Sequence, residues 1–181
     1  MITRSEQKKA QEKALALYEE AGMVLTEEEK QAVEVVDFGL SRLEIEGAQI
    51  LTMVQTERIS VKLLALMPFQ TEPEHGHPPY RDDPGKEETI RHVWGDLYFY
   101  LPGEGKILHG AVPEGKDEVY TCRREFVLQP GEQLTSPPGE KHWFQAGPRG
   151  AVLFSFSTIA RDAQDQFTDP QVNRITQIKD E

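Results

Sequence analysis

The sequence predicts an all-β domain, either a sandwich or a jelly-roll barrel, preceded by two α-helices. From Ala48 onward the hydrophobic period changes from about 3.6 to about 2. The β-rich runs that follow are short, and no helical pattern separates them. Turn residues such as Pro102-Gly103 and Pro130-Gly131 lie between them. Many short strands at short spacing favour a barrel, which encloses a small-molecule pocket at its mouth.

Two amphipathic segments precede the strands. Residues 5–21 predict a helix with Gly22 as its stop, and its apolar positions recur at helical spacing. A second helix is expected from Thr26, where Thr26-x-x-Glu29 has the form of a capping box, to about Val36. Neither segment carries chemistry. We expect residues 1–47 to be a helical extension that packs outside the β domain or takes part in a dimer.

The β domain is expected over residues 48–170. The predicted strands are 49–56, 60–67, 88–94, 96–101, 119–128 and 152–157. The polar tail, residues 171–181, is open to two interpretations, a short helix or a frayed end.

Composition limits the function classes. The formal net charge is −11, so the clustered Lys and Arg that nucleic-acid phosphates require are lacking. No apolar run approaches the roughly 18 residues needed to span a bilayer, and the first residues lack the apolar segment of a signal peptide. Cys122 is the only cysteine, which fits a reducing compartment and predicts a buried, inert thiol. We therefore expect a soluble, cytoplasmic protein.

Three histidines and one glutamate have the pattern of a metal site. His75 and His77 are two residues apart, so both point to the same face wherever this segment is a strand. Glu88 and His142 would complete a set of three nitrogens and one oxygen if the chain folds back on itself. Neutral imidazole and carboxylate are good ligands for a borderline divalent metal.

These residues also carry a family resemblance. His75-x-His77 with Glu88-x6-Gly95 is similar to the first cupin motif, and Gly131-x5-Pro137-x-Gly139-x2-His142 is similar to the second. The spacing from His77 to Glu88 is longer than in most cupins, and Ala146 stands where many have Asn. More narrowly, residues 73–91 (PEHGHPPYRDDPGKEETIR), 141–152 (KHWFQAGPRGAV) and 167–170 (FTDP), with 22–28 and 37–40, resemble the short, cupin-type D-lyxose isomerases. The resemblance runs from about Ala21 to Pro170 and implies a cupin double-stranded β-helix.

Four ligands would leave two corners of an octahedron open for water or for substrate oxygens. A metal that only holds the fold is more often closed by four protein ligands, commonly thiolates, so an open site indicates chemistry. The ligand set suits Mn²⁺, Fe²⁺, Co²⁺, Ni²⁺ or Zn²⁺. The resemblance implies Mn²⁺ and an aldose-ketose isomerisation through an enediol, which needs a side chain that moves a proton between adjacent carbons.

Three residues near Glu88 are candidates for roles in that reaction. Lys86 shares the strand parity of Glu88 and is expected to act as acid and base or to contact the sugar. Glu87 has the opposite parity, but a bulge in the loop could turn it inward as a second catalytic group. Arg91, which completes the family-like Lys-x-Glu-Thr-x-Arg run, is a candidate for substrate binding or for an ion pair that supports the site.

Further candidates flank the second motif and the C-terminal signature. Parity favours Phe144 over Trp143 as an inward aromatic wall on which a sugar could stack. Phe167 and Asp169 belong to the segment that the resemblance places over the barrel mouth, where they could bind substrate, although Asp169 before Pro170 is also a turn signal. Of the two remaining histidines, His92 is expected in the core or behind the metal ligands, and His109 on the surface.

One position departs from the resembled family. Many members have a Glu in place of Ser155 that could serve as a second base, and a serine cannot remove a carbon-bound proton unaided. Either another group such as Lys86 or Glu87 then relays the proton, or this chain has a different substrate or reduced activity.

The sequence thus favours a metal-dependent isomerase of a free sugar. The pairs that the resemblance implies are D-lyxose with D-xylulose and D-mannose with D-fructose, and a homodimer is expected. Two alternatives stay open. One is an Fe²⁺ oxygenase with the same ligands, and the other is a non-catalytic cupin that binds metal and sugar.

Overall fold

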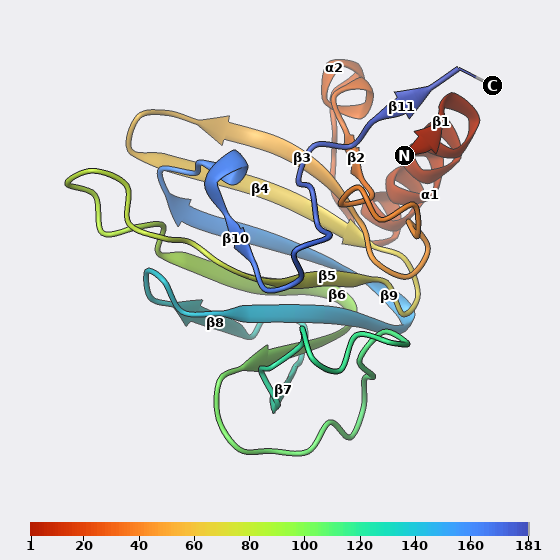
Figure 1. The fold of residues 1–181 in the computed structure, drawn as a ribbon. Helices are drawn as coiled ribbons and strands as arrows, with labels where there is room; N and C mark the ends of the chain where they lie inside the picture. The colour runs from red at the N-terminus through yellow and green to blue at the C-terminus, as the bar shows by residue number, and fades with distance from the viewer. Residues whose placement is uncertain (181) are drawn as a thin grey trace.

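The computed structural model describes residues 1–180 and shows a mostly β fold built on one curled sheet (Figure 1). Strands run in the order β10-β5-β9-β4-β3-β2, and β6 pairs with β7, β8 and β9. Along the chain the elements are β1 (Ile2–Thr3), α1 (Arg4–Glu20), α2 (Glu27–Gln31), β2 (Glu34–Val36), β3 (Ala48–Gln55), β4 (Ile59–Leu66), β5 (Thr71–Gly76), β6 (Glu88–Leu101), β7 (Arg124–Leu128), β8 (Gln133–Ser136), β9 (His142–Thr158), the short 3-10 helix η1 (Asp162–Gln164), β10 (Gln166–Phe167) and β11 (Ile178–Lys179).

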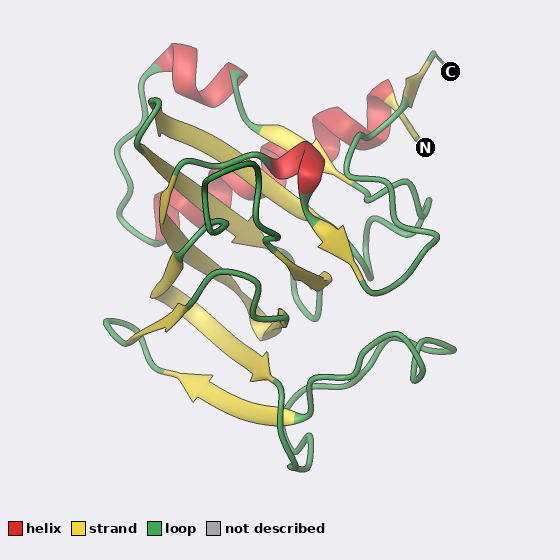
Figure 2. Ribbon diagram, turned by 60° about the vertical axis from the view of Figure 1, so that its left-hand side comes forward, coloured by secondary structure: helices red, strands yellow, loops and turns green. Residues whose placement is uncertain are grey.

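The first predicted helix is confirmed as α1. Thr3 and Glu6 form a capping box at its start, which satisfies two backbone amides that would otherwise lack partners. Its buried residues, Ala10, Ala14 and Tyr18, share one face. The helix packs against the outside of the sheet (Figure 2). The Tyr18 hydroxyl lies 3.0 Å from carbonyl oxygens of both β3 and β4, so the helix is fixed to two adjacent strands.

The second predicted helix is too long. The capping box of Thr26 and Glu29 is present, but α2 ends at Gln31 and buries no side chain. The following valines form β2, which pairs with β3 through Glu34↔Ile50 and Val36↔Ala48. A five-residue helix without an apolar face gains little from packing, so β-branched residues that can join a sheet do so instead.

The two longest strands differ from their predicted lengths. The runs expected at 88–94 and 96–101 are one strand, β6, and the run expected at 152–157 is the end of β9. The strand continues through Gly95, although its pairing with β9 shifts register next to this residue. Only glycine fits there, because φ is +92° and a Cβ would lie 2.1 Å from the Gly150 carbonyl oxygen. The run expected at 119–128 is a strand only from Arg124. The pattern also gave no sign of β5 and β8, which are short and polar.

The barrel interior holds the main core. Its buried residues include Leu64, Leu97, Phe99, Phe144 and Leu153, from β4, β6 and β9. A second apolar cluster lies between α1 and the outside of the sheet. The apolar interior continues into a polar region built around β5, where the candidate site lies.

The C-terminal tail is neither of the two expected forms. β11 pairs in parallel with β1 through Ile2↔Ile178, so the described termini lie side by side (Figure 1). The terminal amine of Met1 lies 2.5 Å from the Asp37 carboxylate, which holds the same end of the chain. The tail therefore returns across the N-terminal elements.

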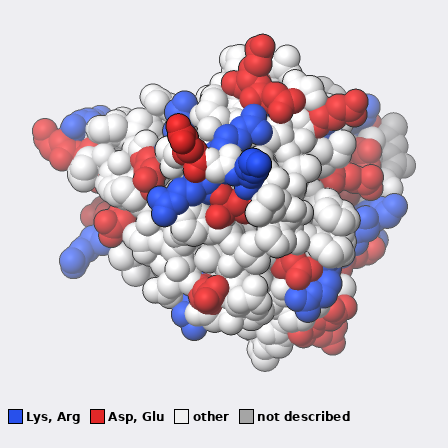
Figure 3. Space-filling view, turned by 90° about the horizontal axis from the view of Figure 1, so that it is seen from below, with Lys and Arg blue, Asp and Glu red and all other residues white. Residues whose placement is uncertain are grey.

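Charges of both signs are interspersed on the surface. On the face seen in Figure 3, Lys and Arg lie among Asp and Glu with wide uncharged areas between them. None of the helices within residues 1–180 has both the length and the apolar character that a membrane crossing requires.

Candidate metal centre

The structure brings the four predicted ligands together. His75, His77, Glu88 and His142 each offer one ligand atom, and these atoms all lie within 4.8 Å of one another. His75 on β5 and His142 on β9 are cross-strand partners, while Glu88 begins β6. All four side chains are 5 % exposed or less. Two predicted hairpins that are distant in sequence thus converge on one point.

A glycine positions His77 beside this cluster. Gly85 has φ +106°, and a Cβ there would lie 2.4 Å from the carbonyl oxygen of His77. Only a residue without a side chain lets the loop before Glu88 approach so closely. On the other side, the Gly139 amide donates to the same carbonyl oxygen at 3.0 Å. Both loops therefore fix the backbone from which the imidazole projects.

Outward hydrogen bonds orient all three imidazoles. Nδ1 of His75 lies 2.8 Å from the Pro73 carbonyl oxygen, Nδ1 of His77 lies 2.7 Å from Asp165 Oδ1, and Nδ1 of His142 lies 3.1 Å from the Glu140 carbonyl oxygen. A proton on each Nδ1 leaves the Nε2 lone pair directed inward, which is the arrangement found behind metal-binding histidines.

The inward nitrogens meet the Glu88 carboxylate. Glu88 Oε2 lies 3.2 Å from Nε2 of His77 and 3.3 Å from Nε2 of His142. Nε2 of His142 is fully buried and has no hydrogen-bond partner among the described residues. Lone pairs of nitrogen and oxygen that face each other in a buried site need a cation between them. The donor set therefore fits a divalent metal.

The protonation states of His75 and Glu88 suit metal binding. Burial, together with the neighbouring imidazoles His142 and His77, lowers the pKa of His75 well below its ordinary value, so the ring is neutral. Burial alone would raise the pKa of Glu88, but the Lys86 ammonium and the imidazoles outweigh it and hold that pKa well below its usual range. A neutral imidazole and an ionised carboxylate are the forms that bind metals.

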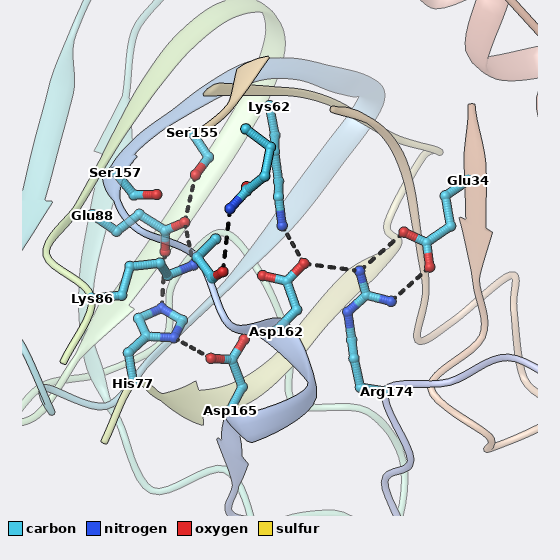
Figure 4. Close-up of polar contacts among 12 residues, drawn as sticks. Glu34, Lys62, His77, Lys86, Glu88, Ser155, Ser157, Asp162, Asp165 and Arg174 are labelled. Atoms are coloured by element: carbon cyan, nitrogen blue, oxygen red, sulfur yellow. Dashed lines mark hydrogen bonds and ion pairs between the residues drawn. The ribbon is translucent and has the colours of Figure 1, made fainter. Parts of the chain in front are cut away.

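The second oxygen of Glu88 binds two further side chains. Lys86 Nζ donates to Glu88 Oε1 at 2.9 Å, and Ser155 Oγ donates to the same oxygen at 2.5 Å (Figure 4). Lys86 is buried at the site, as its strand parity predicts. Ser155, the position where a second base was expected, instead orients the carboxylate of a candidate metal ligand.

A small cavity adjoins the cluster. Its volume is about 30 Å³, and His75, Glu88, Lys86 and Phe144 line it together with residues of the C-terminal segment. A water molecule needs roughly 10–15 Å³ measured in this way. The cavity in this closed form therefore holds about two waters and no sugar.

Ion pairs close this cavity from the side of η1. Asp162 pairs with Lys62 of β4 and, at 3.5 Å, with Arg174, which in turn lies 2.8 Å from Glu34 of β2 (Figure 4). Arg161 lies 3.3 Å from Asp83 in the loop between β5 and β6. We call residues 159–174 the closing segment. Polar contacts hold residues 161–165 over the cavity, while Phe167 and Val172 pack against the apolar core and anchor the other end of the segment.

The aromatic candidates lie where they were expected. Phe144 points into the barrel, lines the cavity and stacks on Phe99, while Trp143 packs on the opposite face of β9 against Tyr100. Phe167 pairs with His75 across β10 and β5, and their rings lie 5.5 Å apart. Both phenylalanines thus support the wall of the site.

Three other candidates do not line the cavity. Glu87 lies directly before β6 and is exposed, with its backbone hydrogen-bonded to Thr158. Arg91 is also exposed and donates to Gln133 on the outer face. Asp169 is buried, but it pairs with Lys116 from the loop before β7.

Of the two other histidines, one is internal and one external, as expected. The His92 ring nitrogens lie 2.6 and 2.9 Å from the carbonyl oxygens of Leu128 and Trp94. His109 is exposed and contacts Glu125. Cys122 is buried, and burial with the nearby Glu74 carboxylate raises its pKa to about 12, so the thiol stays protonated and inert.

Several residues at the site were not predicted from the sequence. Glu72, Lys62, Asp162, Asp165 and Arg174 all line the cavity. Glu72 has the wrong strand parity relative to His75, but a bulge between them reverses it. The others come from separate parts of the chain, and no local spacing connects them to the histidines.

Comparison with known proteins shows which enzymes this chain is similar to. No protein-family model matches the chain. The chain is 47 % identical over 176 residues to a D-lyxose ketol-isomerase of Cohnella laeviribosi, with 97 % of each chain covered. It is 45 % identical over 181 residues to a D-lyxose/D-mannose isomerase of Thermosediminibacter oceani, covering 99 % of this chain and 100 % of that one.

Solved structures show the same fold at much lower identity. An L-ribose isomerase of Cellulomonas parahominis without ligand has a TM-score of 0.82 at 16 % identity, and one of Acinetobacter sp. DL28 in complex with L-ribose has 0.80 at 16 %, each with 98 % of both chains covered. These two support the fold. Because the curated relatives match at 45 to 47 % over nearly the whole length, the chain belongs to the D-lyxose ketol-isomerase family.

Proposed function

We propose that this protein interconverts a free aldose and its ketose, D-lyxose with D-xylulose and also D-mannose with D-fructose. The observation that carries the proposal is the buried cluster of His75, His77, Glu88 and His142 beside a polar cavity. Full-length similarity to the D-lyxose and D-lyxose/D-mannose isomerases supports the choice of sugars. The net charge of −11 is in keeping with an unphosphorylated substrate.

The four clustered residues would hold one divalent metal, and Mn²⁺ is our proposal for its identity. A divalent cation here would polarise the sugar carbonyl and stabilise the negative charge that develops during enolisation. The donor set of imidazole and carboxylate is compatible with Mn²⁺, and the buried, aligned Nε2 atoms supply the site.

Lys86 is the cationic side chain of the cavity that lies beside the Glu88 carboxylate. Its Nζ lies 2.9 Å from Glu88 Oε1, and the side chain is buried. We assign it a direct contact with a sugar oxygen at the reacting carbons, where an ammonium donor compensates charge as the carbonyl oxygen becomes anionic. Phe144 offers an apolar face beside it, on which the sugar ring or chain can pack.

The sugar is admitted when the closing segment moves. The closed cavity of about 30 Å³ is far below the roughly 300 Å³ at which small-molecule pockets begin. The Lys62–Asp162, Arg174–Asp162 and Arg161–Asp83 pairs can separate without exposing a large apolar surface. Closure after binding would exclude water from the enediol, which is the usual role of such segments.

Two properties beyond the site are part of the proposal. A homodimer is supported by β2, which ends the strand order of the sheet and so presents an edge. A cytoplasmic location is supported by the unpaired, buried thiol of Cys122. Size-exclusion chromatography with light scattering measures the first property, and localisation of a tagged chain measures the second.

The function is tested by incubating the metal-loaded protein with D-lyxose in D₂O and following D-xylulose by NMR. We expect ketose to form without oxygen consumption, and deuterium to enter the sugar at the carbon that is enolised. Oxygen uptake would support an oxygenase instead. Bound metal and sugar without exchange or product would support a non-catalytic binding protein.

A further inference from the structure

Glu72 is a buried acid in the cavity to which neither the sequence motifs nor the metal site assigns a role. It comes from β5 and is the cross-strand partner of Phe144 on β9, as His75 is of His142 on the same two strands. The register shift between Glu72 and His75 turns its side chain inward, and it lines the cavity together with Lys86 and Glu88.

One oxygen of this carboxyl has no partner. Glu72 Oε2 is fully buried and makes no hydrogen bond with any described residue. A buried polar atom without a partner is destabilising, and a bound water or ligand is one of the ways in which such an atom is satisfied. Because this atom belongs to a side chain that lines the cavity, a molecule bound there could satisfy it.

The other charged groups of the cavity are already engaged. Lys86 binds Glu88, and Glu88 belongs to the proposed metal site. Lys62 pairs with Asp162, Arg174 with Glu34 and Asp162, and Asp165 with His77. Within residues 1–180, Glu72 is thus the one titratable cavity group without a hydrogen bond or ion pair.

Its environment also makes the proton easy to exchange near neutral pH. Burial raises the pKa of Glu72 to about 8; Arg174, Lys86 and Lys62 act against burial, and repulsion from Glu88 adds to it. Proton transfer is most effective when the pKa of the side chain lies near the working pH.

We propose that Glu72 is the catalytic residue that carries the proton between C1 and C2 of the sugar. In the aldose, its carboxylate takes the proton from C2. The C2–H electron pair forms the C1=C2 bond, and the carbonyl electron pair moves to O1. The proton of the O2 hydroxyl then passes to O1, C2=O forms, and Glu72 returns its proton to C1. No oxidant or co-reactant is consumed.

The inference rests on the proposed isomerase function, and it is tested with Glu72→Gln, which keeps the shape of the side chain but cannot take a proton from carbon. We expect kcat with D-lyxose and Mn²⁺ to fall at least about 100-fold, in the range typical of a lost acid–base group. Deuterium exchange into the sugar should fall in parallel. The Mn²⁺ content and the affinity for D-lyxose should stay within about threefold of the wild-type values. The melting temperature should stay within a few degrees of wild type.

Glu118→Gln, which alters an exposed carboxylate outside the cavity, is the matched control and should behave as wild type. Glu72→Gln with near-normal kcat overturns the proposal, and so does a variant that changes only KM, since Glu72 would then merely bind a hydroxyl. If Glu72→Gln fails to fold, Glu72→Asp decides, because it retains a carboxyl. Deuterium exchange by Glu72→Asp above 1 % of the wild-type rate supports the proposal, and exchange by this variant below that level contradicts it. A wild-type protein without exchange refutes the isomerase function itself.

Discussion

Asp165 Oδ1 lies 2.7 Å from Nδ1 of His77, so a residue of the closing segment orients one imidazole of the metal centre. The two residues are 88 positions apart. Asp165 follows η1 directly, and the next residue begins β10, which pairs with β5. The segment that covers the cavity and the ligand set beneath it are therefore mechanically connected.

This contact predicts that Asp165→Ala weakens metal binding. Removal of the acceptor frees the Nδ1 proton and the orientation of His77, and the loss of such a supporting contact typically costs about 10- to 100-fold in metal affinity. Competition with a chelator of known affinity measures the effect. Asp180→Ala, at an exposed position outside the site, is the control. Equal affinities for the two variants would show that the contact does not support the metal.

His142→Ala should lose bound metal and isomerase turnover together. His142 is fully buried, and the alanine removes the one imidazole that lies on β9 among the ligands. Metal analysis after dialysis and a ketose assay give the two readouts. His109→Ala, an exposed histidine, should keep both. Full metal content in His142→Ala would remove it from the ligand set.

Lys86→Met should separate metal binding from isomerase turnover. The substitution keeps the volume of the buried chain but removes the ammonium that lies 2.9 Å from Glu88. We expect Lys86→Met to retain bound metal, because all four ligand side chains remain, and its kcat to fall by about 100-fold or more, as for a lost charge-stabilising donor. Lys141→Met, at an exposed lysine, is the control. Unchanged kcat in Lys86→Met would disprove its contact with the reacting oxygens.

The closing segment should open more often than the sheet below it. Its ion pairs are partly exposed, as at Arg161 and Asp83, while β9 is hydrogen-bonded on both sides. Amides in residues 160–167 should therefore exchange with solvent faster than those of 151–157. A bound sugar should slow the exchange of the first group by at least about threefold. Equal protection with and without sugar would exclude closure over the substrate.

The sequence predicted the metal cluster because its information is local. His75 and His77 share a face by strand parity, and the turn glycines that bring the second hairpin close are part of the same motifs. Lys86 and Phe144 also followed from parity, because Lys86 lies two residues before Glu88 at the start of β6 and β9 pairs regularly around Phe144. In a strand without a bulge, side chains alternate between the two faces, so the position of a residue in the sequence predicts the face to which its side chain points.

The remainder of the site could not be predicted in this way. Glu72 is turned inward by a bulge in a strand whose residues, Thr71–Gly76, show no alternation of apolar and polar types. Asp165 and Arg174 reach the cavity only because the tail folds back over the barrel. Glu87, for which a bulge was considered, lies directly before β6 and is exposed. The spacing of residues in the sequence predicts neither a bulge within a strand nor the return of a distant segment to the site.

Glu125 predicts an acid-sensitive loop outside the site. Its carboxylate accepts hydrogen bonds from the amides of Leu108 and His109, lies 2.8 Å from the His109 ring, and accepts from the Tyr100 hydroxyl at 2.9 Å. Burial opposes ionisation, but these donors outweigh it and lower the pKa of Glu125 from its ordinary 4.5 to about 2. The carboxylate thus ties residues 108–110 to β7.

A lowered carboxyl pKa stabilises the fold fully above the unfolded value of about 4.5, and that contribution is lost as the pH falls toward 2. Glu125→Gln should therefore be about 2 kcal/mol less stable than wild type at pH 6, as expected for lost hydrogen bonds to a charged group. The difference should shrink steadily between pH 4.5 and pH 2. Urea unfolding of both proteins across this range measures it. A difference that stays constant over the window would show that the charge of Glu125 does not hold the loop.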